Sequence, residues 1–202
     1  MTKYWDERYS SDVFVFGVAP HDFLAAQSAR FRPGMRALAV ADGEGRNAVW
    51  LARQGLDVIC IDASEFGLAK AHRLAAAQNV ALRTMHLDIR EYAWPAAQFD
   101  VITSIFVHFD VHDREYIHSC MQRSLKPGGL LVLVAFTPEQ LALDTGGPHQ
   151  IELLYTADEM RSHFAGMIIH HLDAIVCELH EGEAHTGLAA VLRLLAEKPR
   201  SA

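Results

Sequence analysis

The sequence predicts an α/β fold built on a doubly wound, mostly parallel sheet of seven strands that ends in an antiparallel hairpin. Between residues 36 and 136, apolar strand-like runs alternate with helical patterns, and such alternation is typical of a parallel sheet covered on both faces. Near the C-terminal end, two long β-like runs are separated by only a few residues. So short a connection permits only antiparallel pairing, because a parallel crossover needs about a dozen residues or more.

The predicted elements follow in order along the chain. Residues 4–9 resemble one or two helical turns, and residues 22–31 carry apolar side chains near helical spacing until Pro33-Gly34 breaks the pattern. Gly55 ends the first helix of the alternating region, and Ser64 is placed to cap the second. The predicted strands cover residues 36–41, 57–62, 82–87, 100–106, 130–136, 167–179 and 184–195, and the predicted helices among them cover residues 45–54, 64–78, 113–125 and 157–164.

Composition places the chain among ordinary soluble globular proteins. Half of its 202 residues are apolar, and its formal net charge is −7 without any block of Lys and Arg, so no nucleic-acid partner is expected. No apolar run reaches the ~20 residues that cross a bilayer, and the charged N-terminal stretch shows no signal core, so no membrane partner is expected either. Cys60, Cys120 and Cys177 lie far apart in apolar surroundings, which is typical of reduced core cysteines in a cytoplasmic protein.

The turn over residues 41–47 carries the main chemical signal. An apolar run ends there in Gly43-x-Gly45-x-x-Ala48, a helical pattern follows at once, and Asp62 ends the next strand. Glycine lets a ligand approach the backbone closely, and a helix start offers unpaired N–H groups. This spacing fits the dinucleotide fingerprint, and the same geometry also serves S-adenosylmethionine. With either nucleotide, an acidic residue in the place of Asp62 can accept hydrogen bonds from ribose hydroxyls.

Three features disfavour an oxidoreductase that binds NAD(P), which we keep as the alternative. A dehydrogenase usually adds a catalytic domain, and 202 residues leave little room for one. Single-domain reductases need a Tyr-x-x-x-Lys pair, and none of the 5 tyrosines is followed by Lys at that spacing. The predicted terminal hairpin does not belong to the standard dinucleotide fold.

A set of ordered motifs resembles class I S-adenosylmethionine-dependent methyltransferases. These motifs span about residues 35–136 and are Ala41-Asp42-Gly43-Glu44-Gly45-Arg46-Asn47, Asp62, Asp88 and Leu125-Lys126-Pro127-Gly128-Gly129. Further segments look like the small-molecule branch, which includes tellurite-resistance and thiopurine methyltransferase-like proteins. They are the Tyr4–Tyr9 opening, the Gly-Arg-Asn helix start, the Asp144–Pro148 segment and Glu183-Ala184-His185-Thr186-Gly187 of the hairpin.

The resemblance implies a Rossmann-like methyltransferase fold and S-adenosylmethionine as the cofactor. It further implies methyl transfer to a small-molecule acceptor, such as a thiol, selenium or tellurium compound, by in-line displacement. One methyltransferase domain is expected over residues 1–202, with a helical flap (1–33), a cofactor-binding core (34–136) and a substrate-side loop, helix and hairpin (137–202). The sequence departs from the family at Ala39, where an acidic residue is usual, and at Ala41, where a glycine is usual. This departure motivates a third hypothesis, a cofactor-binding module without catalysis.

The resemblance also implies which residues bind the cofactor. Asp62 would hold the ribose, Asp88 would meet the adenine amino group, and Arg8 would pair with the cofactor carboxylate. The full implied set is Trp5, Arg8, Tyr9, Ala41, Asp42, Gly43, Gly45, Asn47, Asp62, Ala63, Ser64, Asp88, Ile89, Ile105 and Phe106.

The sequence does not identify a residue that must be catalytic. A soft anionic acceptor needs no general base, whereas a hydroxyl or amine acceptor does, and the candidates for that role are His108, His149 and His185. His108 and His112 have the spacing of a helical metal pair but lack further ligands, so no metal is expected. The outer edge of the predicted hairpin is a candidate surface for pairing two copies of the chain.

Overall fold

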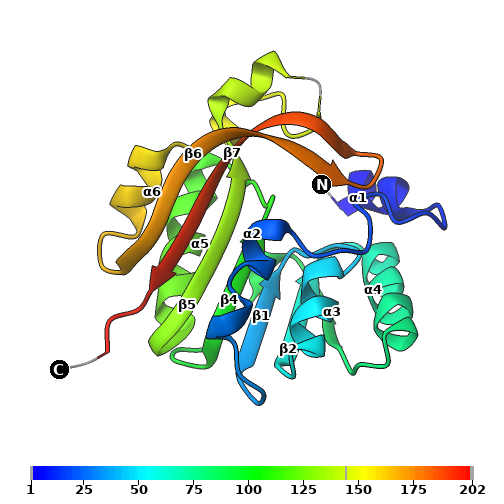
Figure 1. Ribbon diagram of the computed structural model, residues 1–202, viewed down its shortest axis with the longest axis horizontal. Coiled ribbons are helices and arrows are strands. Elements are labelled where there is room, and N and C mark those ends of the chain that lie inside the picture. The colour runs from blue at the N-terminus through cyan, green and yellow to red at the C-terminus, as the bar shows by residue number, and fades with distance from the viewer. Residues whose placement is uncertain (1, 144, 201–202) are drawn as a thin grey trace. The chain divides into compact units, whose positions relative to one another are not determined.

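A computed structural model describes residues 2–143 and 145–200 of the chain (Figure 1), so Asp144 of the motif noted above lies outside the described residues. The sheet has seven strands in the order β3-β2-β1-β4-β5-β7-β6. Neighbours β1 and β2, β2 and β3, and β4 and β5 are parallel, whereas β5 and β7 are antiparallel. The predicted parallel sheet with a terminal antiparallel hairpin is therefore confirmed.

The elements lie close to their predicted ranges. The strands are β1 (Arg36–Val40), β2 (Asp57–Asp62), β3 (Arg83–His86), β4 (Phe99–Ile105), β5 (Leu125–Phe136), β6 (Ile168–Glu181) and β7 (His185–Glu197). The α-helices are α1 (Thr2–Tyr9), α2 (Asp22–Ala25), α3 (Arg46–Arg53), α4 (Glu65–Ala77), α5 (Val111–Ser124) and α6 (Ala157–His163). Short 3-10 turns are η1 (Ser28–Arg30), η2 (Ile89–Glu91), η3 (Pro138–Ala142) and η4 (Ile151–Leu153). Among the described residues, no helix is both long enough and apolar enough to cross a membrane.

The chain divides into two compact units, which we describe separately. The first unit comprises Met1–Tyr92 and Glu181–Ala184, and the second comprises Ala93–His180 and His185–Ala202. The turn of the terminal hairpin therefore belongs to the first unit, although most of both hairpin strands belong to the second.

In the first unit, α3 and α4 pack on the small parallel sheet of β1, β2 and β3. The β1 side chains Ala37–Val40 are fully or almost fully buried, as expected for a strand covered on both faces. The predicted cap of α4 is confirmed, because the Ser64 hydroxyl oxygen accepts a hydrogen bond from the backbone N–H of Gly67. These elements fix the carboxyl ends of β1 and β2, where the predicted nucleotide site begins.

In the second unit, β5 supplies the core, with Leu131–Ala135 fully buried between its neighbours β4 and β7. Helix α5 begins at Val111, two residues earlier than predicted, because the Asp110 carboxylate accepts hydrogen bonds from the first turn and caps it. The chain becomes extended at Leu125, so the Lys126–Gly129 segment, which lies between the predicted helix (113–125) and the predicted strand (130–136), already belongs to β5.

Candidate active site

The glycine turn after β1 is a tight left-handed turn. Ala41, Gly43 and Gly45 have positive φ values of 46°, 54° and 82°. Ala41 thus adopts a conformation that favours glycine, at the position where the resemblance leads one to expect that residue. Ala41 therefore keeps the backbone conformation that a glycine would adopt, at some cost in backbone strain.

Asp62 joins this turn to the start of α4. One carboxylate oxygen accepts the backbone N–H of Gly43 at 2.8 Å, and the other accepts the N–H of Ser64 at 2.8 Å. Burial raises the pKa of Asp62, and the hydrogen bonds from Ser64 and Gly43 oppose that rise. A carboxylate offers about four lone-pair positions, so Asp62 retains acceptor capacity for ligand hydroxyl groups.

Asp42 braces the first turn of α3. Its carboxylate accepts the Asn47 Nδ2 amide at 2.7 Å and the Ala48 backbone N–H at 2.8 Å. Burial raises its pKa to about 6, against the lowering effect of these two hydrogen bonds. Asn47 in turn accepts the backbone N–H of His21 at 3.0 Å. The structure thus shows Asp42 and Asn47 holding the protein's own backbone, and their predicted contact with a cofactor stays a prediction.

A buried ion pair fastens the N-terminal segment to the glycine turn. The Glu44 carboxylate lies 2.7 Å from the Lys70 ammonium group, and the two residues are 2% and 5% exposed. Glu44 also accepts the backbone N–H groups of Val15 and Phe16, while Lys70 donates to the carbonyl of Val13. The sequence analysis missed this pair, because the 26 residues between its members give no sign that they meet.

A second ion pair joins α3 to the turn of the hairpin. Arg46 donates to the Glu181 carboxylate at 2.7 Å and to the carbonyl oxygen of Phe16 at 3.3 Å. The Ala184 backbone N–H donates to the carbonyl of Val15 at 3.2 Å. The segment of residues 13–17 is therefore held on one side by the glycine turn and on the other by the hairpin turn.

Helix α1 places Tyr9 directly against the glycine turn. A Cβ atom added to Gly43 would lie 2.4 Å from the Tyr9 hydroxyl, and one added to Gly67 would lie 3.1 Å from the Tyr9 ring. Tyr9 is buried, and both burial and the nearby carboxylate of Asp62 raise its pKa well above the usual value. Glycine at position 43 thus makes room for Tyr9 from within the protein. The Trp5 ring stacks on Tyr9 at a centroid distance of 5.4 Å.

Arg8 lies among aromatic rings on the same helix. Its guanidinium carbon is 5.9 Å from the centroid of the Trp5 ring and 5.3 Å from that of Phe16, and one terminal nitrogen donates to the Tyr4 hydroxyl. The Arg8 Nε atom is buried and has no hydrogen-bond partner within the described part of the chain. A buried cationic donor without a partner is costly, so this N–H is suited to an anionic ligand.

The predicted adenine-side residues lie at the ends of β2 and β3. Asp88 caps the short η2 turn and pairs with Arg90 at 2.5 Å, which lowers the pKa of that carboxyl group. Ile89 is buried, and the carbonyl oxygen of Ala63 lies 2.9 Å from the Nε2 atom of His86. The structure describes these contacts without a ligand, so the predicted adenine contacts of Ala63, Asp88 and Ile89 stay predictions.

The second unit carries an aromatic cluster where β4 and β5 end. Phe106 follows β4 with a positive φ of 55°, and its ring stacks on Phe136 at a centroid distance of 4.5 Å. The His185 ring stands edge-on to both phenylalanines, at 4.7 and 5.3 Å. A Cβ atom added to Gly147 would lie 2.7 Å from the Phe136 ring, so the loop of residues 145–148 packs directly on this cluster. Ile105, also predicted to contact the cofactor, is buried at the end of β4.

His108 is a neutral, doubly bonded imidazole. Its Nδ1 atom lies 2.8 Å from the carbonyl oxygen of Leu153, which can only accept, so the proton sits on Nδ1. Its Nε2 atom then accepts the backbone N–H of Phe136 at 3.3 Å. Burial lowers the pKa of His108 to about 4. To serve as a general base, His108 would have to release Phe136. Of the other candidates, His149 is exposed and His185 is buried.

Two buried polar residues that the sequence analysis missed support this end of the second unit. Arg114, 2% exposed, donates to the carbonyl groups of Phe109, Glu152 and Leu154 and pairs with Glu159 at 2.7 Å. Arg114 lies on α5 three residues before the buried Ile117 and seven before the buried Met121, so all three share the inward face of the helix. This spacing is the signal that could have identified Arg114 from the sequence. The second residue, Gln140, donates from Nε2 to the Thr145 hydroxyl and the Gly146 carbonyl and accepts the N–H of Ala190.

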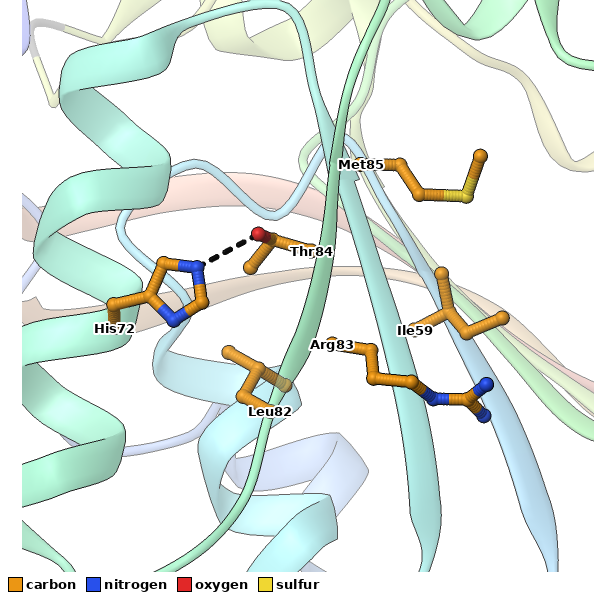
Figure 2. Close-up of a pocket in the computed structure, with 6 residues that line it drawn as sticks. All are labelled: Ile59, His72, Leu82, Arg83, Thr84 and Met85. Carbon is orange, nitrogen blue, oxygen red and sulfur yellow. Dashed lines mark hydrogen bonds between the residues drawn. The ribbon is translucent and has the colours of Figure 1, made fainter.

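A surface hollow lies apart from these residues in the first unit. It has a volume of about 440 Å³ and runs along β3 (Figure 2). Figure 2 shows its side chains projecting to both sides of that strand, with His72 bonded to Thr84 on one side and Met85 on the other. None of the predicted site residues lines it. Within residues 2–143 and 145–200, no cluster of three or more His, Cys, Asp or Glu is placed to hold a metal ion.

Comparison with known proteins identifies the region that holds the glycine turn. Residues 37–129, a little under half of the chain, match the family described as the methyltransferase domain. The ubiquinone biosynthesis O-methyltransferase of Sinorhizobium fredii is 28% identical over 142 residues, which are 63% of this chain and 56% of the relative. This chain therefore spans a little over half the length of that relative.

Solved structures agree on the fold. One solved structure concerns the conversion of a disulfide bond into a thioacetal group during echinomycin biosynthesis. It has a TM-score of 0.78 at 18% identity, and the match covers 100% of this chain and 94% of that one. TehB from Haemophilus influenzae has a TM-score of 0.73 at 20% identity, covering 98% of this chain and 66% of its own. At these identities the likeness concerns the fold alone.

Proposed function

We propose that this chain is a methyltransferase that uses S-adenosylmethionine to methylate a small-molecule acceptor. The observation that carries the proposal is Asp62, a buried carboxylate that joins the glycine turn to the start of α4 while keeping acceptor capacity. A ribose needs such an acceptor for its two hydroxyl groups. The match of residues 37–129 favours S-adenosylmethionine over NAD as the nucleotide.

Arg8 supports the same proposal at the amino-acid end of the cofactor. Its Nε atom is buried without a partner in the described part of the chain, and the guanidinium carbon lies 5.9 Å from the centroid of the Trp5 ring and 5.3 Å from that of Phe16. A carboxylate would satisfy this donor with a charge-assisted hydrogen bond. S-adenosylmethionine carries such a carboxylate at the end of its methionine part, and its sulfonium centre supplies the methyl group when the cofactor is bound.

The chemistry asks the protein mainly to align the acceptor and to exclude water, since in-line displacement at a sulfonium needs little else. We infer that the acceptor is a soft anion, namely a thiolate or a selenium or tellurium anion of the kind handled by the tellurite-resistance and thiopurine branch. His108 supports this inference, because both of its nitrogens are already hydrogen-bonded and its pKa is lowered to about 4. Acceptors of this kind lose their proton before binding and need no base.

Calorimetric titration tests the cofactor assignment. The protein is expected to bind S-adenosylmethionine and its demethylated product with micromolar-range affinity and to bind NAD poorly. Asp62→Ala should weaken binding of the product by about 1–3 kcal/mol, because charge-assisted bonds to the ribose are lost. Asp62→Asn, which keeps an acceptor for Gly43, serves as the milder variant if the alanine variant folds poorly.

Asp57→Ala is the matched control for this titration. It removes a half-exposed carboxylate at the opposite end of the same strand, where Asp57 pairs with Arg36 and Arg83. Its affinity for the demethylated product should equal that of the unaltered protein. Preference for NAD, or unchanged affinity in both Asp62 variants, would refute the assignment. Tight binding without turnover on thiols, selenium or tellurium oxyanions and small amines would favour the non-catalytic module.

A further inference from the structure

Strand β6 is the terminal strand of the sheet, and its charged residues are acidic. It extends over the 14 residues Ile168–Glu181, without a lysine, arginine, proline or glycine. Ile168 is 48% exposed and Val176 is 60% exposed. Natural edge strands are usually short, or are blunted with lysine or proline, because an open row of backbone groups invites a further strand.

We propose that a second copy of this chain pairs with β6 along this edge, antiparallel and about a two-fold axis that passes through Ala174. A two-fold axis perpendicular to the sheet keeps each face continuous, so outward residues of one copy meet outward residues of the other. Exposure alternates along β6, with the even-numbered residues more exposed, and only registers that pair residues of the same parity preserve this pattern. The interface is independent of the proposed enzymatic activity.

The register centred on Ala174 matches polar with polar and apolar with apolar at three pairs, and it mismatches Asp173 with Ile175 and Ile168 with His180. On the outward face it sets His170 opposite Glu178 of the second copy, and by symmetry Glu178 opposite His170. On the same face Leu172 meets Val176, again twice. On the inward face Ile169 meets Leu179 of the second copy. Hydrogen-bonding polar pairs and apolar pairs directly across two strands each stabilise antiparallel pairing.

The neighbouring registers are not self-complementary. A shift that moves the axis to residue 173 sets the Asp173 carboxylate opposite its own copy. A shift to residue 175 sets His170 opposite His180 and Leu172 opposite Glu178. Like groups or mismatched groups then face each other across the strands, which disfavours pairing. Of these three registers, the one centred on Ala174 therefore has the fewest mismatched pairs along β6.

Cross-linking through the axis tests the register directly. In a Cys177→Ser background, Ala174→Cys places two thiols opposite each other at a Cα separation of about 4.5–5.5 Å, which a disulfide can span. Mild oxidation with oxidised glutathione should then yield a covalent dimer, the glutathione being reduced as the two thiols lose their protons and electrons. Val176→Cys in the same background is the control, because residue 176 faces residue 172 and should give little cross-linking. Equal cross-linking of the two variants, or none in either, would overturn the proposal.

The mass in solution provides a second test that requires no new thiol. Sedimentation equilibrium should give twice the 22.5 kDa of the single chain at micromolar concentrations. Val176→Lys should return the mass to that of one chain, because it places a charge on the pairing edge. Val111→Lys, at a 52% exposed valine on α5, is the matched control and should remain dimeric. A single-chain mass for the unaltered protein, or a dimer that survives Val176→Lys, would contradict the pairing.

Discussion

Different interactions stabilise two regions of the molecule. One is the glycine turn of the first unit, and the other is formed by the ends of β4 and β5 in the second unit. Around the glycine turn, charged side chains make the main interactions. Glu44 pairs with Lys70, Arg46 pairs with Glu181, and Asp62 accepts hydrogen bonds from two backbone N–H groups. In the second unit the corresponding strand ends carry stacked aromatic rings, chiefly Phe106 and Phe136, and the buried Arg114 pairs with Glu159 nearby.

This difference extends to the protonation of buried groups. Burial raises the pKa of Asp42 in the first unit to about 6, and it lowers the pKa of His108 in the second to about 4. In both cases burial disfavours the charged form. The first unit nevertheless keeps several charged groups by pairing them, whereas the second keeps His108 neutral through two neutral hydrogen bonds.

The largest expected effect comes from breaking the buried ion pair of the first unit. Glu44→Ala leaves the Lys70 ammonium group buried without its carboxylate and strips Val15 and Phe16 of their acceptor. Removal of one partner of a buried pair costs about 3–5 kcal/mol, because the remaining charge is uncompensated. The free energy of unfolding from urea titration should fall by that amount.

The control for this variant is an exposed pair in the same unit. Lys3 and Glu7 lie 3.8 Å apart with side chains 91% and 70% exposed, so Glu7→Ala should change the free energy of unfolding by less than about 1 kcal/mol. If the two variants cost the same, charge pairing does not distinguish the glycine turn from the protein surface.

Intermediate effects are expected from pH, with opposite signs in the two units. Asp42 has a folded-state pKa raised to about 6 from 3.8, so its contribution to stability is present below pH 3.8 and is lost as the pH rises through 6. His108 has a folded-state pKa lowered to about 4 from 6.5, so its contribution is present above pH 6.5 and is lost as the pH falls through 4. Each group alters the slope of stability against pH by up to about 1.4 kcal/mol per pH unit.

Two variants separate these contributions in urea titrations between pH 4.5 and 7. Asp42→Asn should lose stability relative to the unaltered protein at the acidic end, because the gain from protonating Asp42 disappears. His108→Gln should show the reverse, since Gln can donate to Leu153 and accept from Phe136 without taking up a proton. His180→Gln, at a side chain that is 74% exposed, should leave the profile unchanged. Parallel profiles for all four proteins would argue against the contrast between the units.

The fold was predictable because it depends on local patterns. The alternation of apolar runs and helical patterns located the strands to within a few residues, and Ser64 was recognisable as a cap from its type and position. Asp110 was missed as a cap, because one side chain two residues ahead of the expected start decides where α5 begins. The extended backbone from Leu125 similarly reflects pairing with β4, which no local pattern reveals.

The partners of buried polar groups were less predictable than the fold. Lys70 and Glu181 meet the glycine turn from 26 and 135 residues away, and no spacing rule connects them to it. Nor does the sequence indicate that Ala41 and Phe106 adopt positive φ values, since such residues seldom do so. Tertiary packing imposes both. The predicted cofactor and acceptor contacts of the site residues themselves await a ligand.

The last comparison concerns what fills the space beside glycine in each unit, and three alanine substitutions isolate it. Gly34, Gly43 and Gly147 all have positive φ, so alanine at each costs about 1–2 kcal/mol in backbone strain. Gly34 has no atom within 4 Å of the added Cβ, whereas Gly43 meets the Tyr9 hydroxyl at 2.4 Å and Gly147 meets the Phe136 ring at 2.7 Å. Gly43→Ala and Gly147→Ala should therefore each lose about 1–3 kcal/mol more than Gly34→Ala in urea titration.

A double-mutant cycle then separates the two units. Tyr9→Phe removes the hydroxyl that the new methyl group would strike, so Gly43→Ala should cost measurably less in the Tyr9→Phe background. Phe136 offers no such relief, because it is 1% exposed and the ring atoms themselves make the contact. Gly147→Ala should keep its full cost in the Tyr9→Phe background, since that change lies in the other unit. Equal costs for all three glycine variants would mean that backbone conformation alone, and not the packing of Tyr9 or Phe136, requires glycine at these turns.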